Sequence, residues 1–317
     1  MITIKQLKSI PIFADFKQNE LKEILLNSFT KTLSEKENVF NIDQKRDNFF
    51  VILSGRIAIA RQFGSTNQII EIANPGEFIA EHSLFDPKSK HGHSAQVYSK
   101  EAVLLIMPGK LFRKMPENIK YKLLLNLLPI ISDNFAHASN RIMTIFQIGQ
   151  IISAHDLNSD ELSREILKIL LTGISAQKAL VALRETDADK IKIISINVDN
   201  FNNEGVKKII NLNDDYLMEN IISQGHKINL STSEYLSNKK CQVDYIDRSV
   251  LGFPLTINQK RIGAILLIDK KNADEFSANN EVLLDIIAKM VALRFYQAKQ
   301  MEIKQAEEEL KREYVAM

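Results

Sequence analysis

The sequence predicts an α+β protein built from two globular domains that are connected and followed by long helices. A chain of 317 residues suits two domains of ordinary size. Residues 36–107 contain short apolar runs separated by glycine-bearing turns, a pattern typical of a β-sandwich or barrel. Residues 131–152 instead carry apolar side chains at helical spacing. We expect a first domain over 1–128, a linker helix over 129–155, a second domain over 156–298 and a C-terminal coiled-coil helix over 299–317.

The first domain is predicted to begin with helices and to continue as strands. Residues 1–30 have helical spacing of their apolar side chains. A strand over 49–53 stops at a Ser-Gly turn, and interleaved apolar residues predict another strand over 57–63. A further strand over 69–72 ends at an Asn-Pro-Gly turn.

The linker helix carries a heptad seam, in which apolar or small side chains alternate at spacings of four and three: Ile131, Phe135, Ala138, Ile142, Ile145, Gly149 and Ile152. A seam of this kind favours pairing with another helix, and hence a homodimer. The alternative is a helix that lies on its own domain. Pro129 precedes the seam, and because a proline inside a helix costs about 3 kcal/mol, we expect a kink or a new helix start there.

The second domain alternates helical and strand patterns: a helix over 160–171, strands over 179–183, 191–194, 249–255 and 261–268, and a final helix over 281–298. Beyond it, apolar residues at spacings of three, four or seven are flanked by charged ones, a pattern that indicates a coiled coil. The alternative there is a solvated terminal helix.

Composition excludes several classes of protein. A net charge of +2 implies no polyanionic partner, so no nucleic acid is expected. The single cysteine, Cys241, forms no internal disulfide and fits a reducing cytoplasm. No apolar run approaches the roughly 18–20 residues of a membrane span. Phosphate-loop, nucleophile-elbow and zinc-helix motifs are absent, so we predict no enzyme; a catalytic domain would lie beyond Met317.

The stretch Pro75-Gly76-Glu77-Phe78-Ile79-Ala80-Glu81-His82-Ser83-Leu84-Phe85, followed by His93-Ser94-Ala95-Gln96-Val97, has a family signature. It resembles the phosphate-binding cassette of the cyclic nucleotide-binding domain, and the resemblance covers about residues 5–128. It implies a jelly-roll-like β-barrel with flanking helices and a small-molecule ligand, cAMP or cGMP, with no other cofactor expected. The implied ligand-binding residues are Gly76, Phe78, Ile79, Ala80, Glu81, His82, Ser83, His93, Ser94 and Ala95.

Two positions of the cassette depart from the family pattern. The resemblance implies that Glu81 accepts the ribose 2′-hydroxyl and that Ser94 contacts the phosphate. However, Ala80 stands in place of a glycine and His93 in place of the arginine that grips the phosphate. Arginine offers a permanent charge and a fork of donors, whereas an ordinary imidazole is mostly neutral at pH 7. Loss of a hydrogen bond to a charged group weakens binding by roughly ten- to a hundredfold.

Three interpretations of this pocket stay open. It binds cAMP or cGMP weakly, with protonated His93 replacing the arginine and Lys88 or Lys90 assisting; it binds another small anion; or it is an empty structural relic. A metal site at His82, His91 and His93 is not expected, since no carboxylate or thiolate stands at ligand spacing.

The second domain has a resemblance of its own, carried by residues 247–255, 263–268 and 276–288. These segments resemble a GAF domain, which implies a six-stranded antiparallel sheet flanked by helices. A helix-turn-helix would occupy this place in a transcription factor. We therefore predict a cytoplasmic signal-sensing module that binds a small molecule and transmits through dimer helices. The alternatives are a scaffold that binds no ligand, or the truncated sensor part of a histidine kinase with a downstream kinase or response domain as partner.

Overall fold

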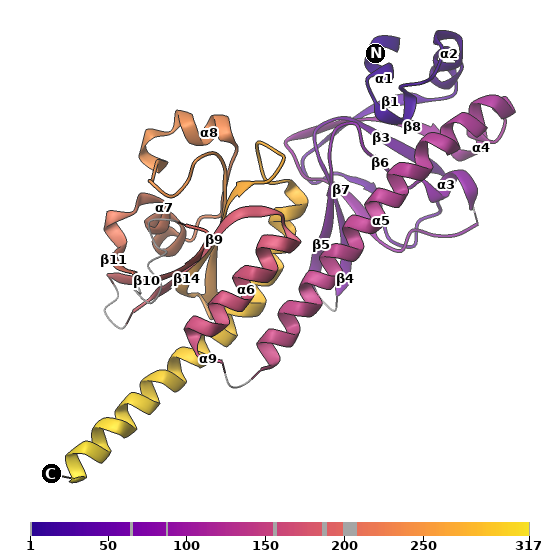
Figure 1. Ribbon diagram of the computed structural model, residues 1–317. Helices are drawn as coiled ribbons and strands as arrows, with labels where there is room; N and C mark the ends of the chain where they lie inside the picture. Colours follow the sequence, from indigo (N-terminus) through magenta and orange to yellow (C-terminus); the bar gives the residue numbers. More distant parts are fainter. Residues whose placement is uncertain are drawn as a thin grey trace. The chain divides into compact units, whose positions relative to one another are not determined.

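The computed structural model describes residues 2–63, 66–86, 88–154, 157–185, 189–198 and 208–316. The chain forms two compact units, Met1–His137 and Ala138–Met317 (Figure 1). Each unit has its own sheets and its own hydrophobic core.

The first unit is a pair of antiparallel sheets with helices before and after them. Its elements are α1 (Ile4–Lys8), η1 (Pro11–Phe13), α2 (Gln18–Leu26), β1 (Phe29–Ser34), β2 (Asn38–Phe40), β3 (Asn48–Ser54), β4 (Ile57–Phe63), β5 (Thr66–Ala73), β6 (Phe78–Ile79), α3 (His82–Phe85), β7 (Ser94–Val97), β8 (Glu101–Pro108), α4 (Gly109–Phe112) and the start of α5 (Glu117–Ser153). The strands predicted over 49–53, 57–63 and 69–72 are confirmed as β3, β4 and β5.

The sheets have the orders β1-β8-β3-β6 and β2-β7-β4-β5. In the described part of the chain they remain two separate four-stranded sheets, so the predicted closed barrel is not found. Side chains alternate across each strand, which places Ile57 and Ile59 of β4 opposite Val97 and Ala95 of β7 in the core between the sheets. A second core joins the helices to the other face of β3 and β8.

Helix α5 is 37 residues long and contributes to both hydrophobic cores. Leu123 and Leu127 belong to the core of the first unit and Ile148 to that of the second. The helix does not start anew at Pro129, which lies inside it. Its first turns are anchored by packing, and this offsets the cost of the proline.

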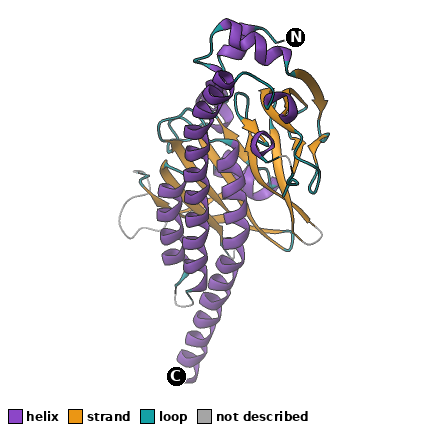
Figure 2. Ribbon diagram, turned by 90° about the vertical axis from the view of Figure 1, so that its right-hand side faces the viewer, coloured by secondary structure: helices purple, strands orange, loops and turns teal. Residues whose placement is uncertain are grey.

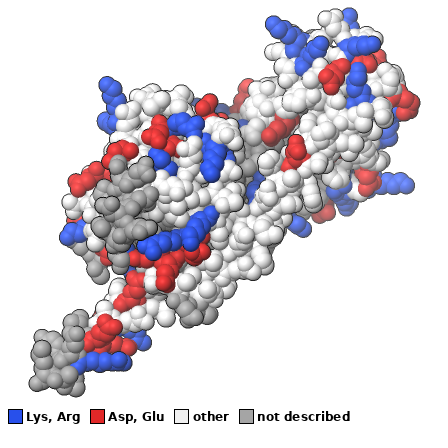
Figure 3. Space-filling model, viewed as in Figure 1, with Lys and Arg blue, Asp and Glu red and all other residues white. Residues whose placement is uncertain are grey.

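The predicted heptad seam of α5 is divided between buried and exposed residues. Ile131 packs against the core of the first unit, and Ile145 and Ile152 pack against that of the second. Phe135 and Ile142, in contrast, are 73% and 68% exposed. In the view of Figure 3, the length of α5 that faces the reader carries few charged side chains.

The second unit is a six-stranded antiparallel sheet with the order β11-β10-β9-β14-β13-β12. Its elements are α6 (Ser159–Gly173), β9 (Ala176–Arg184), β10 (Lys190–Ile196), β11 (Lys208–Asn211), η3 (Leu212–Asp214), α7 (Tyr216–Glu219), η4 (Asn220–Gln224), β12 (Ile228–Leu230), α8 (Thr232–Ser237), η5 (Lys239–Cys241), β13 (Val250–Ile257), β14 (Lys260–Lys270) and α9 (Ala278–Ala316).

Helices cover both faces of this sheet. Helices α6 and α9 run side by side over one face, where Leu167, Phe253 and Phe295 share a core (Figure 2). The short helices α7 and η4 cover the other face, around Leu217 and Leu266. The strand number and direction are those that the GAF resemblance implies, but membership of that family stays a prediction.

Helix α9 continues past the second core without interruption, so residues 299–316 prolong the last helix of the unit. The side chains of Leu310 and Tyr314, on which the predicted coiled coil partly depends, lie outside the described residues. None of the described helices has the length and apolar character needed to cross a membrane.

Candidate functional site

Hydrogen bonds to strand β3 fix the beginning of the cassette. Gly76 has a φ of +88° and donates its N–H to the carbonyl of Ile52 at 2.8 Å. Phe78 and Ile79 then pair with Val51 and Phe50 as the two-residue strand β6. These bonds fix the direction from which the chain enters the turn at Ala80.

Ala80 adopts the left-handed conformation that glycine prefers. Its φ is +61°, and its carbonyl accepts a hydrogen bond from the N–H of Ser83 at 3.0 Å. A residue with a side chain pays roughly 1–2 kcal/mol for this conformation. The chain therefore keeps the backbone turn for which the family pattern has a glycine, and the alanine methyl is accommodated at 9% exposure of the residue.

Glu81 stands at the N-cap of α3, and its carboxylate is largely covered. One of its oxygens lies 2.8 Å from His82 Nδ1, and the Glu81 side chain is 25% exposed whereas that of His82 is 63% exposed. A partly buried carboxylate with a single side-chain partner can accept a further hydrogen bond, as a ribose hydroxyl would require.

The other half of the site lies at the start of β7. Ser94 pairs with Ala60 of β4, and its hydroxyl donates to the Ala60 carbonyl at 3.3 Å. Ala95 is fully buried between Ile59 and Phe40. His93 precedes these residues and lies partly buried, with its ring 5.9 Å from that of Phe40.

Burial disfavours the protonated, charged form of both histidines of this loop. The buried His91 ring stacks on Phe40 at 3.8 Å between ring centroids, and desolvation lowers its pKa to about 4. Desolvation likewise lowers the pKa of His93, and although the Glu81 charge opposes this shift, it does not reverse it. At neutral pH the His93 ring is uncharged and offers a single N–H donor. His93 is therefore a weak substitute for arginine as a phosphate ligand.

Two arginines outside the cassette were missed by sequence reasoning. The charges of Arg46 and Arg61 both lower the pKa of His93, which places them in its electrostatic range. Arg61 follows Ile59 by two residues on β4, which puts it on the same side of the strand, at an exposed position beyond the core. The alternation Ile57-Ala58-Ile59-Ala60-Arg61 carried this signal, because it places a cation where a third apolar residue would continue the pattern.

The predicted site residues fall into two groups. Glu81, beside the turn at Ala80, lies within electrostatic range of His93, whereas Phe78, Ile79 and Ala95 are core residues. Ser83 is fully buried, and its hydroxyl has no hydrogen-bond partner among the described residues. Lys88 and Lys90 are exposed on the loop that follows α3. Within the described ranges, no three His, Cys, Asp or Glu side chains gather as metal ligands would.

The family comparison agrees with this geometry. Residues 30–118 match the model of the family described as "Cyclic nucleotide-binding domain". This segment is a cyclic nucleotide-binding domain. The match ends before the second unit, and no curated protein matches the chain.

Solved structures of similar chains each match less than half of this chain. A putative cyclic nucleotide-binding protein from Geobacter metallireducens is 24% identical, and the match covers 42% of this chain and 98% of that one with a TM-score of 0.37. A cyclic nucleotide-binding domain from Methylobacillus flagellatus is 18% identical, with 44% and 80% covered and a TM-score of 0.39. The sensor domain of the transcriptional regulator DNR from Pseudomonas aeruginosa is 23% identical, with 41% and 91% covered and a TM-score of 0.35.

Proposed function

We propose that the chain is a signal-sensing module whose first domain binds a cyclic nucleotide, cAMP or cGMP, with arginines from outside the cassette providing the positive charge. The observation that carries this proposal is the left-handed turn at Ala80 with Glu81 on one side and His93, within range of Arg46 and Arg61, on the other. A cyclic phosphodiester presents a ribose hydroxyl and a single negative charge, which match these two kinds of group.

Each polar group has a distinct role in the proposed complex. The Glu81 carboxylate accepts the ribose 2′-hydroxyl. Neutral His93 donates to a phosphate oxygen, and the Ser94 hydroxyl does so after turning away from the Ala60 carbonyl. The Arg61 guanidinium supplies the charge that the cassette itself lacks, because arginine stays protonated at every physiological pH. Desolvation of the phosphate is offset by this charge rather than by the imidazole.

Transmission is proposed to pass through α5. Its exposed apolar residues fall at spacings of three, four and seven: Tyr121, Leu125, Leu128, Phe135, Ile142 and Phe146. This face would pair with the same face of a second copy and form a homodimer. A ligand that binds one packing of α5 more tightly than another would shift the population between them. The second unit, as a GAF-type domain, would pass the change to a downstream kinase or response domain.

Calorimetric titration of the full chain with cAMP and with cGMP tests the ligand. We expect binding of at least one nucleotide, and we expect Arg61→Gln to weaken it by about ten- to a hundredfold, the range for a hydrogen bond to a charged group. Arg56→Gln is the matched control, since Arg56 is an exposed arginine at the other end of β4, beside Tyr98. Equal losses in both variants would remove Arg61 from the site.

The second candidate function is a dimerising scaffold without a ligand. The exposed apolar face of α5 favours it, because such a face suits association whether or not the pocket is filled. Binding of neither nucleotide at millimolar concentration, together with a stable dimer, would select the scaffold.

A further inference from the structure

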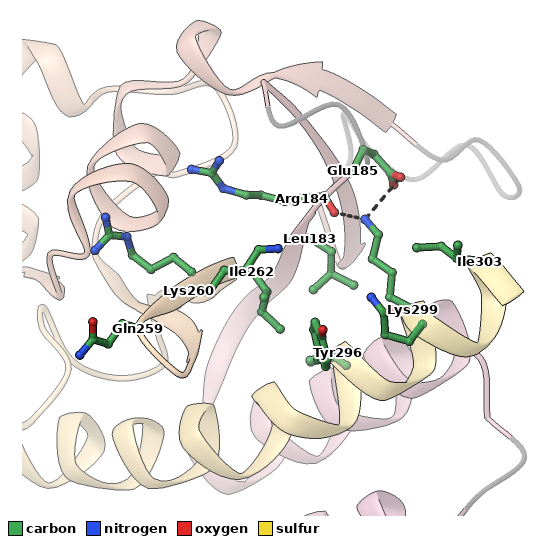
Figure 4. Close-up of a pocket in the computed structure, with 12 residues that line it drawn as sticks. Leu183, Arg184, Glu185, Gln259, Lys260, Ile262, Tyr296, Lys299 and Ile303 are labelled. Atoms are coloured by element: carbon green, nitrogen blue, oxygen red, sulfur yellow. Dashed lines mark hydrogen bonds and ion pairs between the residues drawn. The ribbon is translucent and has the colours of Figure 1, made fainter.

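The second unit contains a cleft that lies apart from the cassette and has a volume of about 440 Å³ (Figure 4). One wall is the end of β9, another is the β13–β14 hairpin, and the third is a face of α9. At the hairpin tip Asn258 and Gln259 both have positive φ, at 45° and 66°, and they form a tight two-residue turn. The walls are thus regular, hydrogen-bonded elements. We call this site the basic cleft.

The floor of the basic cleft is apolar. Leu183 is almost fully buried, Phe295 below it is 1% exposed, and Ile262 is partly buried. Figure 4 shows Leu183, Ile262 and Tyr296 close together at the centre of the cleft. Tyr296 is 38% exposed, so its ring is available at the surface. A flat apolar group could lie against this floor.

The rim of the basic cleft is cationic, with Arg184, Lys260, Arg261 and Lys299 among its lining residues. Arg261 is held by neutral groups: its Nε donates to the carbonyl of Ile222 at 2.9 Å and its Nη2 to that of Ser223 at 2.5 Å. Arg184 Nη2 lies 3.4 Å from the Ser223 hydroxyl. The two carbonyl oxygens position the Arg261 guanidinium without cancelling its charge.

Only part of this charge is balanced from within the cleft. Among the described residues that line it, Glu185 alone carries a carboxylate, and its Oε2 lies 3.6 Å from Lys299 Nζ. Lys299 also donates to the backbone carbonyl of Arg184. The lining residues therefore keep an excess of positive charge above an apolar floor.

We propose that the basic cleft binds a small organic anion that combines a planar ring with a phosphate or carboxylate group. The ring would lie on Leu183, Ile262 and Tyr296, and the anionic group would face Lys260 and Arg261. The volume falls within the range of roughly 300–1,000 Å³ that is usual for small-molecule sites. This site would give the module a second input, independent of the cassette.

A fluorescence titration tests the proposal on the full chain. Because the sequence contains no tryptophan, Tyr296→Trp introduces a single reporter at the cleft. Titration with 4-nitrophenyl phosphate and with 4-nitrobenzoate, whose nitro groups quench indole, should give saturable quenching, and comparing the two separates phosphate from carboxylate. The neutral 4-nitrobenzyl alcohol should quench without saturation. Tyr216→Trp is the matched control, since Tyr216 is 42% exposed and outside the cleft.

Calorimetry without a reporter provides the second measurement. We expect Arg261→Gln and Lys260→Gln each to weaken binding of the better anion by about tenfold. Lys271→Gln, at an exposed lysine outside the cleft, should leave it unchanged. Equal quenching at positions 296 and 216, saturation by the neutral compound, or unchanged affinity in both cleft variants would overturn the proposal. The proposal would also be overturned if dimer formation alone shielded the residue 296 indole from quenching, because a second copy would then occupy the cleft.

Discussion

Ala80 illustrates how one residue can depart from a family pattern and still keep the backbone that the pattern encodes. Its φ of +61° is the conformation that a glycine adopts without cost, and the alanine accepts the strain because β6 and α3 fix the chain on both sides. The substitution therefore stores conformational energy at the candidate site without removing the turn.

We expect Ala80→Gly to stabilise the first unit by about 1 kcal/mol, because relief of the left-handed strain exceeds the added entropy of the unfolded chain. Urea unfolding measures the change. The control is Ala95→Gly in the buried part of β7, where the same exchange should destabilise, since the backbone there is extended. A loss of stability in both variants would show that Ala80 is not strained.

His91 makes the stability of the first unit depend on pH. Its pKa in the folded chain is about 4, whereas an ordinary imidazole titrates near 6.5, so the unfolded chain binds the proton first. The free energy of unfolding is therefore highest above about pH 6.5. It decreases by up to about 3 kcal/mol as the pH falls toward 4. Besides burial, the charges of His93, Arg46 and His82 lower this pKa, and that of Asp47 raises it.

His91→Phe tests this origin of the acid dependence, because a phenyl ring keeps the stacking on Phe40 and cannot titrate. Between pH 7, 5.5 and 4.5, the Tm of the variant should decrease less than the Tm of the unsubstituted chain. His93 retains part of the dependence, since its pKa is also lowered. An unchanged pH profile would exclude His91 as the source.

At the scale of elements, the sequence predicts best where apolar periodicity is strong. The strand expected over 49–53 is β3, and the helix expected over 160–171 is α6. Strand β1 was not predicted, because only Leu33 of its six residues is buried and the sequence shows no alternation. The new helix start expected at Pro129 is wrong, because the helix continues through it and packing of its neighbours can outweigh a local penalty.

The candidate site was predictable only as far as it is local in sequence. The cassette residues follow one another, so a motif finds them, and the turn at Ala80 is where the pattern placed it. Arg46 and Arg61 come to His93 from other segments: Arg61 through the pairing of β4 with β7, and Arg46 through a loop whose backbone bonds to Ser89. The basic cleft has the same character, because it is assembled from β9, β14 and α9. Residues brought together by tertiary structure leave little trace in a linear pattern.

At the scale of the whole molecule, the exposed face of α5 predicts association. Phe135 and Ile142 are the most exposed large apolar residues of its middle section. We expect the chain to sediment as a dimer, and we expect Phe135→Asp with Ile142→Asp to produce monomers, since paired carboxylates would be desolvated in the seam. Asn140→Asp, at an exposed position on the opposite side of the same stretch of helix, tests whether any added charge suffices. A monomeric unsubstituted chain, at micromolar concentration in sedimentation velocity, would contradict the proposed dimer.

The continuity of α5 also restricts how far its length can vary. Leu127 is fixed in one core and Ile148 in the other, and the peptide between them is a single helix. Each inserted residue would rotate everything downstream by about 100°, so Ile148 and the core that holds it would turn together relative to Leu127. Seven residues make nearly two full turns and leave a deviation of only about 20°. A spacer that changes length in steps of seven residues would therefore keep the exposed apolar side chains of α5 on one face of the helix.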